Sequence, residues 1–548
     1  MAELTRRGFV GAAAVGAASI GTLASVALAD EAAASDKTFA DTISWDAEYD
    51  VVVLGMGFSG MVSAMTAADN GASVLICEKE ANGEAGGNSR ICGQGFAWAH
   101  GDEEGSVAYY RALAGGRAVP DDIIDTLGRG VAHTGDIVAS FGLDQSQFTD
   151  ATLPGICPEY PEFEGGENIT QSYAHEGSSD AFLYQHIQSR IASEYAGKID
   201  VWYETPATAL IQEPDQKTVI GVTVERGGEV RNVRALNGVC VCTGGFENDP
   251  EMVQTYLGVI NYNPIGTLSN TGDGIKMCLA AGAKLWHMTS YEGGFGLLGC
   301  GYPIEEGKQA ASALIATFAQ NEMNTGATIV VGDWGKRFGD ESITPRHGHM
   351  GDGNGIWENP RYPAKMWIIW DATQMAAIND AGIFNEDYRD MVVECPTIAD
   401  IVAATGMHED VLTKTLDDFN GYAESGDDKE FGRAAEYMRA FDGEGYFIMP
   451  VKNEILNTQG GPERNANAEI LDASGMPIPH LYSAGEMGGS TACMYQSGSN
   501  VAECLIFGQI AGTSAAAAKD PLPAYAAPEY VESTPAHVGE ETDLVAEA

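Results

Sequence analysis

The sequence contains few basic residues. Lysine and arginine together number 30, against 78 aspartates and glutamates, which gives a formal net charge of −48 over 548 residues. So large an excess of negative charge repels phosphate backbones and anionic membrane surfaces, and it favours solubility. The composition therefore argues against nucleic acid as a partner.

The cysteines lack the spacings of common metal and haem sites. None of the ten cysteines forms the C-x-x-C pair of zinc and iron–sulfur sites, and no C-x-x-C-H haem attachment is present. Cys240 and Cys242 alternate within an apolar run, so we expect them to face one way from a strand as small buried hydrophobic residues. No metal site is predicted, and no chemistry is assigned to the cysteines.

Long apolar runs are absent after the first 29 residues. Those residues combine the paired Arg6 and Arg7 with Phe9, an alanine- and glycine-rich apolar run, and Ala-Leu-Ala at 27–29. The pattern predicts a signal peptide that is cleaved after Ala29. An uncleaved membrane anchor is the alternative, because the run approaches the about 20 residues that span a bilayer. Cleavage is preferred, since alanine and glycine are weakly apolar, and it leaves a mature chain without a membrane span.

The order T-R-R-x-F at 5–9 resembles a twin-arginine signal. Such a signal implies export of a protein that has already folded and loaded its cofactor. The expected location is therefore extracytoplasmic, in the periplasm or at the cell surface.

Residues 50–78 indicate a dinucleotide-binding unit. A β-branched run at 50–54 is followed by G-M-G-F-S-G at 55–60 and then by a helix-like segment. A second apolar strand at 73–77 ends at Glu78, close to the spacing of about 20 residues at which an acid accepts hydrogen bonds from a ribose.

The glycines of this unit have distinct predicted tasks. Gly55 permits the sharp turn, Gly57 lets backbone N–H groups reach a pyrophosphate, and Gly60 lets the helix pack closely on the strand. Other glycines, of 68 in the chain, also cluster beside apolar runs, a distribution typical of close backbone approach to a ligand.

Further motifs follow in a fixed order along the chain. They are G-E-A-G-G-N-S at 83–89, C-T-G-G-F at 242–246, T-G-D-G at 271–274, L-Y-S-A-G-E at 481–486 and G-S-N at 498–500. With the dinucleotide unit they resemble the flavoproteins of the fumarate reductase and 3-ketosteroid dehydrogenase superfamily. The resemblance implies an α/β fold, in which a doubly wound parallel sheet binds FAD and an inserted α+β domain caps it.

The resemblance also implies the cofactor and the residues that hold it. Relatives that attach flavin covalently carry a histidine directly after the Asn-Ser pair, whereas Arg90 follows here, so we expect FAD to be non-covalent. A helix beginning at Ser499 would aim N–H groups at the negative charge of a reduced flavin, although Ser499 and Asn500 are equally suited to simple helix capping. The implied FAD-binding residues are Gly55, Gly57, Ser59, Gly60, Glu78, Lys79, Gly87, Asn88, Ser89, Ala207, Thr243, Gly244, Asp273, Gly485, Glu486, Gly498, Ser499, Asn500 and Val501.

An inserted domain is expected because the flavin motifs pause after about residue 286. Thr397 to Asp400 resembles a capping box, and Leu412, Leu416 and Phe419 define one apolar helix face. This segment is also similar to the helical lid of the same superfamily, which would exclude water from the flavin. The expected organisation is a signal peptide at 1–29, a linker at 30–48, FAD-binding segments at 49–286 and 457–517, a capping domain at 287–456, and a disordered acidic tail at 518–548.

A proton donor is expected near residue 346. In fumarate-reducing relatives an arginine a few residues after G-K-R-F-x-x-E donates the proton, and Arg346 follows G-K-R-F-G-D-E one residue later than usual. Arginine is a poor acid, so it would act as a relay or by stabilising an enolate. His347 and His349 titrate more easily and remain alternatives.

The segment C-M-Y-Q-S-G-S-N at 493–500 carries no charge. By resemblance, Gln496 and Asn457 replace an arginine and a histidine that bind the substrate of dicarboxylate reductases. Loss of a bidentate arginine makes fumarate an unexpected substrate. Tyr495 stands where ketosteroid dehydrogenases carry a tyrosine that bonds the substrate ketone, although a packed core tyrosine is the alternative.

These features predict an exported FAD oxidoreductase that reduces a C=C bond next to a carbonyl in a small acceptor, as in anaerobic respiration. Tyr495 and Gln496 would polarise the carbonyl, and Arg346 or a neighbour would return the proton. Without a nicotinamide site, the electrons would come from a partner redox protein. Three alternatives stay open: a ketosteroid-type dehydrogenase, a flavin electron carrier without its own substrate, and a binding protein with vestigial flavin motifs.

Overall fold

The computed structural model describes most of the chain between residues 37 and 525. The described ranges are 37–151, 157–177, 180–214, 217–294, 296–304, 321–343, 345–351, 357–382, 389–490 and 495–525. The predicted signal peptide, residues 30–36 of the linker and residues 526–548 of the predicted tail lie outside them. The chain divides into two compact units, one of residues 1–42 with 521–548 and one of residues 43–520.

An eight-stranded sheet carries the predicted dinucleotide unit. Its main path is β21-β22-β9-β1-β2-β6, and β8 extends from β9 to β7. The pairs β22/β9, β9/β1, β1/β2 and β2/β6 are all parallel, as in a doubly wound sheet. The strands are β1 (Ala47–Leu54), β2 (Val74–Cys77), β6 (Ile199–Trp202), β7 (Ala207–Gln212), β8 (Val219–Arg226), β9 (Glu229–Val241), β21 (Glu469–Leu471) and β22 (Pro477–Ser483).

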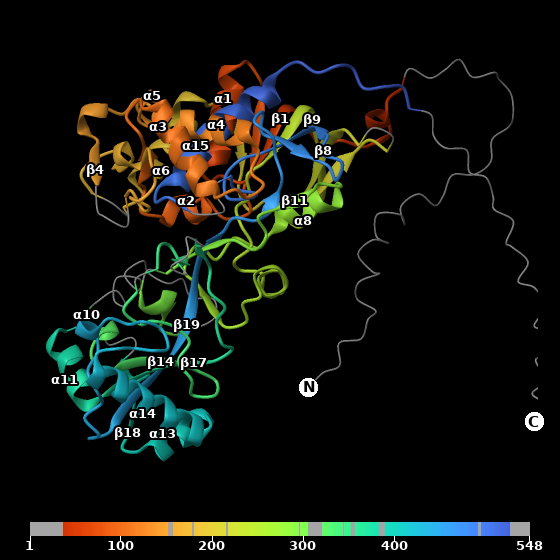
Figure 1. Ribbon diagram of the computed structural model, residues 1–548. Helices are drawn as coiled ribbons and strands as arrows, with labels where there is room; N and C mark the ends of the chain where they lie inside the picture. Colours follow the sequence, from red (N-terminus) through yellow and green to blue (C-terminus); the bar gives the residue numbers. More distant parts are fainter. Residues whose placement is uncertain are drawn as a thin grey trace, which may run out of the picture. The chain divides into compact units, whose positions relative to one another are not determined.

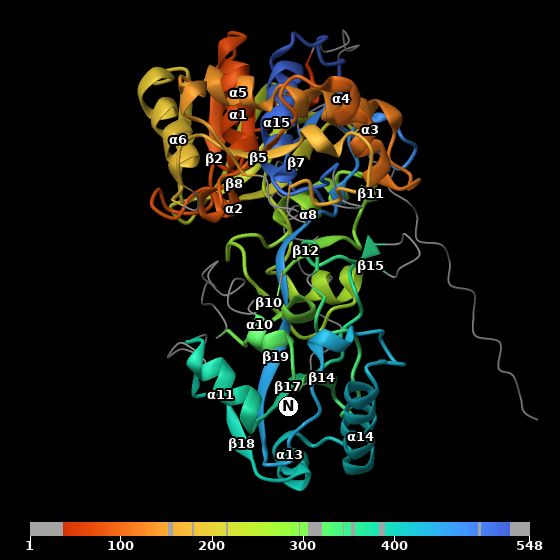
Figure 2. The ribbon, with the colours of Figure 1, turned by 60° about the vertical axis from the view of Figure 1, so that its left-hand side comes forward.

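Helices cover one face of this sheet. Alternate residues of β1 pack into two different cores, one on each face. Val51 and Val53 pack with α1, α4 and α15, whereas Val52 and Leu54 pack with β8 and α8 on the other face. Figures 1 and 2 show α1 and α15 side by side. The helices of this part are α1 (Phe58–Asp69), α2 (Gly87–Ile91), α3 (Glu103–Ala114), α4 (Asp121–Ala132), α5 (Thr134–Ser140), α6 (Phe182–Glu194), α7 (Pro250–Met252), α8 (Asp273–Ala280) and α15 (Ser499–Ala516).

A seven-stranded sheet lies at the centre of the capping lobe. Its main path is β10-β19-β17-β14, with β12, β13 and β18 also paired to the long strand β19. Figure 1 shows β19 leaving the FAD-binding part and running into the lobe, and the predicted boundary at residue 456 falls inside it. The elements are β10 (Tyr262–Pro264), β12 (Tyr291–Gly293), β13 (Cys300–Gly301), α10 (Asn321–Asn324), β14 (Thr328–Gly332), β17 (Met366–Asp371), α11 (Ala372–Asp380), β18 (Val393–Cys395), α13 (Ile398–Thr405), α14 (Glu409–Ser425) and β19 (Tyr446–Thr458).

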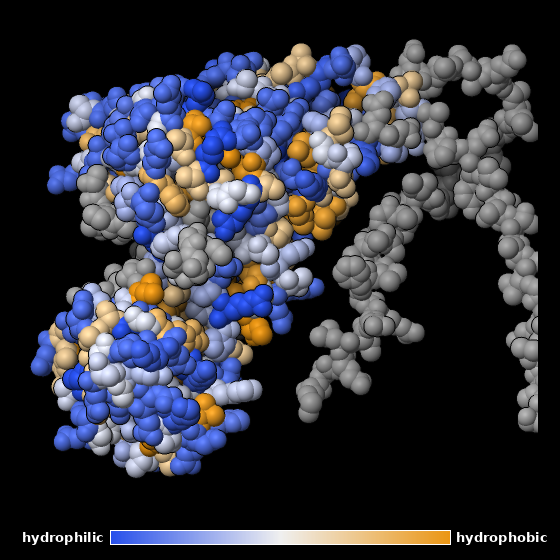
Figure 3. Space-filling view, viewed as in Figure 1, coloured by the Kyte–Doolittle hydropathy of each residue, from blue (hydrophilic) through white to orange (hydrophobic). Residues whose placement is uncertain are grey.

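Small sheets complete the unit. They are β3 (Phe96–Trp98) with β5 (Thr170–Tyr173) and β4 (Thr149–Ala151), β11 (Leu285–Trp286) with β20 (Gly461–Pro462), and β15 (Met350–Gly351) with β16 (Trp357–Glu358). The α/β fold with an inserted α+β lobe is therefore confirmed. No helix among the described residues is long and apolar enough to cross a membrane. The surface in Figure 3 is mostly hydrophilic, with separate small hydrophobic patches.

The predicted helix signals of the lobe are confirmed. Thr397 and Asp400 form a reciprocal capping box at the start of α13. Leu412, Leu416 and Phe419 are buried in the lobe core, so α14 presents the predicted apolar face. These residues explain how the lobe holds its helices against the sheet.

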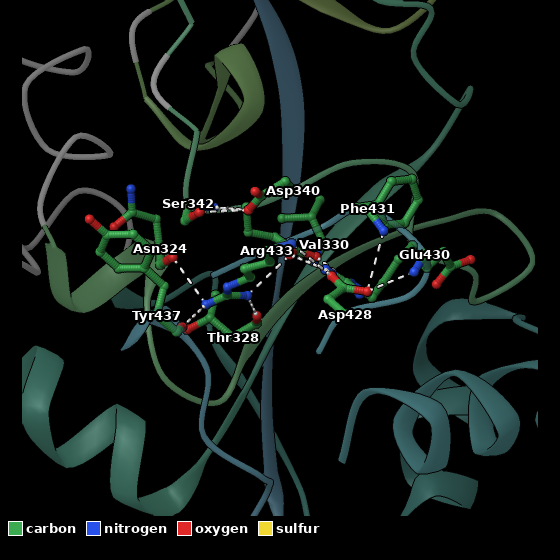
Figure 4. Close-up of polar contacts among 12 residues, drawn as sticks. Asn324, Thr328, Val330, Asp340, Ser342, Asp428, Glu430, Phe431, Arg433 and Tyr437 are labelled. Atoms are coloured by element: carbon green, nitrogen blue, oxygen red, sulfur yellow. Dashed lines mark hydrogen bonds and ion pairs between the residues drawn. The ribbon is translucent and has the colours of Figure 1, made fainter. Parts of the chain in front are cut away.

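A buried ion network explains the G-K-R-F-G-D-E segment. The two guanidinium nitrogens of Arg337 donate to Glu341 at 2.9 and 2.7 Å, and Arg433 donates to the same carboxylate at 3.1 Å. Asp428 accepts from Arg337 at 3.1 Å, and all four side chains are fully buried. Figure 4 shows Arg433 also bonded to backbone groups of the lobe, including the carbonyl oxygen of Thr328 at 2.7 Å. The charged residues of this motif therefore hold the lobe together.

Candidate active site

A cavity opens at the carboxyl ends of β1, β2 and β9. This is the edge of a parallel sheet at which ligands bind in doubly wound folds. Thirteen of the predicted FAD-binding residues line it: Gly55, Gly57, Ser59, Glu78, Lys79, Gly87, Asn88, Ser89, Ala207, Thr243, Gly244, Asp273 and Glu486.

Two glycines let the chain turn from β1 into α1. Gly55 has a φ of 95°, and a Cβ atom there would lie 2.4 Å from the carbonyl oxygen of Cys242. A Cβ at Gly60 would lie 2.1 Å from the carbonyl oxygen of Gly55, so Gly60 supports the turn from outside the cavity lining. The first N–H groups of α1 have no partner within the helix, and they lie beside the cavity that Gly57 and Ser59 line. This arrangement suits a pyrophosphate.

The acid at the end of β2 is buried and firmly held. Glu78 accepts from the backbone N–H groups of Met56 and Glu80, each at 2.9 Å. Burial raises the pKa of Glu78, and these two donors oppose the effect. Lys79 donates to Asp273 at 2.9 Å and to Thr271 at 2.8 Å across the cavity wall.

Amides and carboxyls gather at another part of the cavity wall. Glu486 accepts from Asn457 at 2.8 Å and from Asn88 at 3.1 Å. Asn88 and Asn270 also donate to Glu247, at 3.1 and 2.8 Å. Burial, followed by repulsion from Glu486, raises the pKa of Glu247 to about 8. Our sequence reasoning missed Glu247 and Asn270, although Glu247 directly follows the C-T-G-G-F motif.

The remaining predicted FAD-binding residues lie around the start of α15. Gly498 has a φ of 83° and precedes Ser499, whose hydroxyl is 2.5 Å from that of Tyr110. Asn500 accepts from Gln459 at 2.9 Å, and Val501 follows in the first turn. Gly485 lies against Ser59 of α1, where a Cβ atom would come within 2.7 Å of the serine hydroxyl. These five residues are not part of the cavity lining described above.

Tyr495 and Gln496 approach α15 from within the core. The Tyr495 hydroxyl accepts from the backbone N–H of Gly498 at 3.1 Å, so it caps the helix. The buried amide oxygen of Gln496 accepts from Tyr109 at 2.6 Å and from the backbone N–H of Glu159 at 2.8 Å. Its amide nitrogen, the group that would donate to a substrate carbonyl, donates to the carbonyl oxygen of Ser497 at 3.1 Å and to the Cys157 sulfur at 3.4 Å. Protein partners thus occupy both ends of the amide, an arrangement that departs from the predicted contact between Gln496 and a substrate carbonyl.

The segment around residue 346 divides between the surface and the interior. The Arg346 guanidinium donates to Glu162 at 2.7 Å and stacks 4.1 Å from the Trp357 ring. His347 turns inward: its Nδ1 lies 2.6 Å from the Glu159 carboxyl, and its ring stands edge to face with Tyr495 at 4.7 Å. Of the predicted proton donors, His347 is therefore brought to Tyr495, while Arg346 pairs with Glu162.

A second histidine and acid lie next to this pair. Nδ1 of His349 is 3.9 Å from Glu292, which accepts from Gln459 at 3.1 Å. Burial lowers the pKa of His347 to about 3 and of His349 to about 4, and it raises the pKa values of Glu159 and Glu292 well above the usual range. Both imidazoles are thus neutral near pH 7, and burial favours the protonated form of both carboxyls. Glu159 and Glu292 were not predicted, because only the tertiary fold brings them to the histidines.

Buried cations are already paired in the described part of the chain. Only Arg337, Arg433 and Arg464 are buried there among the basic side chains. The first two share Glu341, and Arg464 pairs with Glu503. No buried guanidinium or ammonium in the described ranges is therefore left to clamp a substrate carboxylate, and these ranges hold no cluster of residues that fits a metal ion.

Comparison with known families matches residues 50–501 to the FAD binding domain family. The chain belongs to this family. As the family implies, it is an FAD-dependent oxidoreductase, and its relatives act on carbon–carbon bonds in both directions.

Three relatives illustrate the range of reactions. Urocanate reductase of Eggerthella lenta is 26% identical, with 86% of this chain and 75% of the relative aligned. Vinyl phenol reductase of Lactiplantibacillus plantarum is 24% identical over 81% of this chain and 90% of the relative. The 3-oxosteroid 1-dehydrogenase of Mycolicibacterium smegmatis is 26% identical over 86% of this chain and 97% of the relative.

A solved structure supports the fold. The crystal structure of 3-ketosteroid delta1-dehydrogenase from Sterolibacterium denitrificans superimposes with a TM-score of 0.65 at 18% identity. The match covers 86% of this chain and 99% of that one. It extends the α/β assignment to the capping lobe as well as the FAD-binding sheet.

The FAD-binding protein has a cavity that fits its cofactor. The tight approach of Gly55 to Cys242 and the open first turn of α1 suit a pyrophosphate, and buried Glu78 suits a ribose. Asn88 and Ser89 also line the cavity. These residues would hold FAD, whose bound form supplies two-electron chemistry to a substrate.

Proposed function

We propose that the protein is an exported reductase of activated C=C bonds in small neutral carbonyl compounds. The observation that carries the proposal is the polar but uncharged surroundings of Tyr495. The polar groups around it include the His347 imidazole, edge to face with its ring, and the amide of Asn500 in the first turn of α15, which is bonded to Gln459. The pKa values of His347 and His349, about 3 and about 4, keep both imidazoles uncharged near pH 7. A carboxylate placed here would lose its water without gaining a cation, so an uncharged molecule binds better.

The positions that would read a dicarboxylate support the same substrate class. Asn457 donates to Glu486, and the amide oxygen of Gln496 is bonded to Tyr109 and to the backbone of Glu159. Neither offers a positive charge. That a relative is named vinyl phenol reductase agrees with an uncharged acceptor, because a vinyl phenol has no carboxylate.

The site would act by positioning and proton transfer. Tyr495 would polarise a substrate carbonyl, since its hydroxyl can donate while it accepts from Gly498. Bound FAD would supply the hydride to the β carbon of the substrate. We expect it to be non-covalent, because Arg90 stands where a covalent attachment would need histidine.

Export and an external electron donor complete the proposal. The twin-arginine pattern around Arg6 and Arg7 supports export after folding, to the periplasm or cell surface. A protein exported in this way needs a partner redox protein for its electrons, as in anaerobic respiration.

Desaturation of a steroid-like ketone is the second candidate. It is favoured by the likeness to a 3-oxosteroid 1-dehydrogenase over 97% of that relative and by the inward position of Tyr495. A neutral site suits either direction, so the direction needs its own measurement.

An anaerobic assay tests the proposed function. Viologen-reduced, FAD-loaded protein is mixed with the neutral enone 4-phenyl-3-buten-2-one, with cinnamate, or with fumarate, and flavin reoxidation is followed by absorbance. We expect the enone to be the fastest acceptor and fumarate the slowest. Faster turnover of fumarate would overturn the neutral-site proposal, and dye-linked oxidation of a saturated ketosteroid without enone reduction would establish the second candidate.

A further inference from the structure

We propose that His347 donates the proton that completes C=C reduction and that Glu159 is the positioning residue that returns a proton to it. The inference rests on the proposed function and deepens it. It starts from one contact, the 2.6 Å between Nδ1 of His347 and the nearer carboxyl oxygen of Glu159. Both side chains are buried, Glu159 completely.

One segment of the FAD-binding part, at Gln496 and Ser497, holds Glu159 in place. The second carboxyl oxygen accepts from the backbone N–H of Ser497 at 2.9 Å, just before α15. The backbone N–H of Glu159 donates to the amide oxygen of Gln496 at 2.8 Å. The carboxyl is thus tied to the approach to α15, and only the oxygen that faces His347 is left to carry a proton.

The capping lobe presents the histidine in a strained backbone conformation. His347 has a φ of 44°, which is uncommon for a residue with a side chain. Gly348 follows with a φ of 82°, and a Cβ atom there would lie 2.7 Å from the backbone of Gly293 in β12. Strained positions of this kind persist where the surroundings fix them, often at functional sites.

Tyr495 connects the pair to the start of α15. The His347 ring stands edge to face against Tyr495, whose hydroxyl caps that helix at Gly498. The long strand β19 carries Asn457, which donates to Glu486 in the cavity lining. The proton donor and the carbonyl-binding tyrosine therefore lie side by side near one end of the FAD-binding residues.

The proton balance follows from a neutral pair. Burial raises the pKa of Glu159 and lowers that of His347 to about 3, so the imidazole is uncharged and a proton shared by the pair rests on the carboxyl. As a hydride adds to the β carbon, Nε2–H of His347 gives its proton to the α carbon, and the proton of Glu159 moves to Nδ1. The substrate gains one hydride and one proton. Glu159 is left as a carboxylate and His347 carries its proton on Nδ1. Uptake of one solvent proton at Nε2 and return of the Nδ1 proton to Glu159 restore the starting pair.

Other titratable groups lie near the pair. Glu292 of β12 faces His349, and Tyr160, the residue after Glu159, packs on Trp357. The Tyr109 hydroxyl shares the Gln496 oxygen with the backbone N–H of Glu159. Arg346 directs its guanidinium to Glu162, with a side-chain exposure of 21%. As an arginine held by a surface carboxylate, it is a far weaker acid than the buried pair.

Variants of both residues test the assignment in the FAD-loaded protein. We expect His347→Gln to slow anaerobic reoxidation by 4-phenyl-3-buten-2-one by about 100-fold or more, with an unchanged flavin spectrum. Glu159→Gln keeps the shape of the side chain but carries no acidic proton, so we expect a similar loss and a changed pH profile. The matched control is His133→Gln, which alters a surface histidine bonded to Glu103 at 3.0 Å, and it should leave the rate unchanged.

A spectroscopic readout separates this inference from the proposed function. ¹⁵N-histidine spectra should show one ring, absent in His347→Gln, that stays neutral at pH 6 and whose Nδ1 signal shifts in Glu159→Gln. An imidazolium signal for His347 at pH 6, or no shift in Glu159→Gln, would overturn the pair. So would a loss in Arg346→Gln that equals the loss in His347→Gln. If the wild type reduces no acceptor, the proposed function fails while the spectra still decide the pair.

Discussion

Two buried polar clusters of this protein compensate their charges in opposite ways. In the capping lobe, Glu341 accepts from the guanidinium groups of Arg337 and Arg433. Beside α15, Glu159 meets the imidazole of His347, and no buried guanidinium of the described residues accompanies it. Both clusters are shielded from water, so burial alone does not distinguish them.

The difference separates architecture from chemistry. Arginine keeps its proton at every physiological pH, so the network of Arg337 and Arg433 fixes the geometry of the lobe and transfers no proton. A neutral acid and imidazole can exchange a proton without creating net charge in the interior. The motif around Arg337 was therefore informative about lobe structure, and it located His347 only as a neighbour of Arg346, whereas Glu159 lies on a segment without a motif.

Removing the shared carboxyl of the lobe should have the largest effect on stability. Glu341→Gln leaves two buried guanidiniums with one carboxylate fewer, and breaking a buried pair in this way lowers the unfolding free energy by about 3–5 kcal/mol. Urea denaturation followed by tryptophan fluorescence measures the change. The control is Lys414→Ala, which removes an exposed ion pair with Asp418 on α14 and should not shift the midpoint. Equal midpoints for both variants would show that the network does not stabilise the lobe.

A third buried carboxyl, that of Glu454, extends the comparison to the pH dependence of stability. Glu454 in β19 is fully buried, and neither of its oxygens has a hydrogen-bond partner among the described residues. Burial raises its pKa from 4.5 to about 8. The folded state therefore keeps a proton that the unfolded chain releases, and the contribution of Glu454 to stability is complete below pH 4.5 and lost as the pH rises toward 8.

Glu454→Gln should remove this dependence. The unfolding free energy of the wild type minus that of the variant should fall by up to about 1.4 kcal/mol per pH unit between pH 5 and 8. Urea unfolding at four pH values measures it, and groups common to both proteins cancel in the difference. A difference that stays flat, or rises with pH, would contradict the raised pKa of Glu454.

The parts of the fold that the sequence predicted are those with local causes. Strand, glycine turn, helix and acid at 50–78 are adjacent in the chain, so their spacing alone specifies β1, α1, β2 and Glu78. The capping box at Thr397 and the start of α15 at Ser499 are local for the same reason. Thirteen predicted residues then meet in one cavity because they follow the strands of one sheet edge.

The parts that the sequence did not reveal depend on distant contacts. Glu159 and His347 are 188 residues apart. His347 was named only as an alternative to Arg346, and Glu159 lies in no recognisable motif. Gln496 was expected to face a substrate, but its amide nitrogen donates to the carbonyl oxygen of Ser497, and Tyr109, 387 residues away, occupies its oxygen. Pairing between side chains of this separation depends on how the lobe and the FAD-binding sheet pack, which no local pattern specifies.

The smallest expected effect concerns a helix end in the lobe. The Thr397 hydroxyl accepts from the backbone N–H of Asp400 at 3.3 Å, and the Asp400 carboxylate accepts from the N–H of Thr397 at 2.9 Å. Thr397→Ala should lower the unfolding free energy by about 1 kcal/mol and speed amide hydrogen exchange in the first turn of α13. Thr413→Ala, within α14, is the matched control, and alanine's better helix propensity should keep it within about 0.5 kcal/mol of the wild type. The cap is local, whereas the Glu341 network ties several segments. Only the Glu341→Gln variant should therefore change amide hydrogen exchange throughout the lobe. A lobe-wide change in Thr397→Ala would contradict this difference between the two sites.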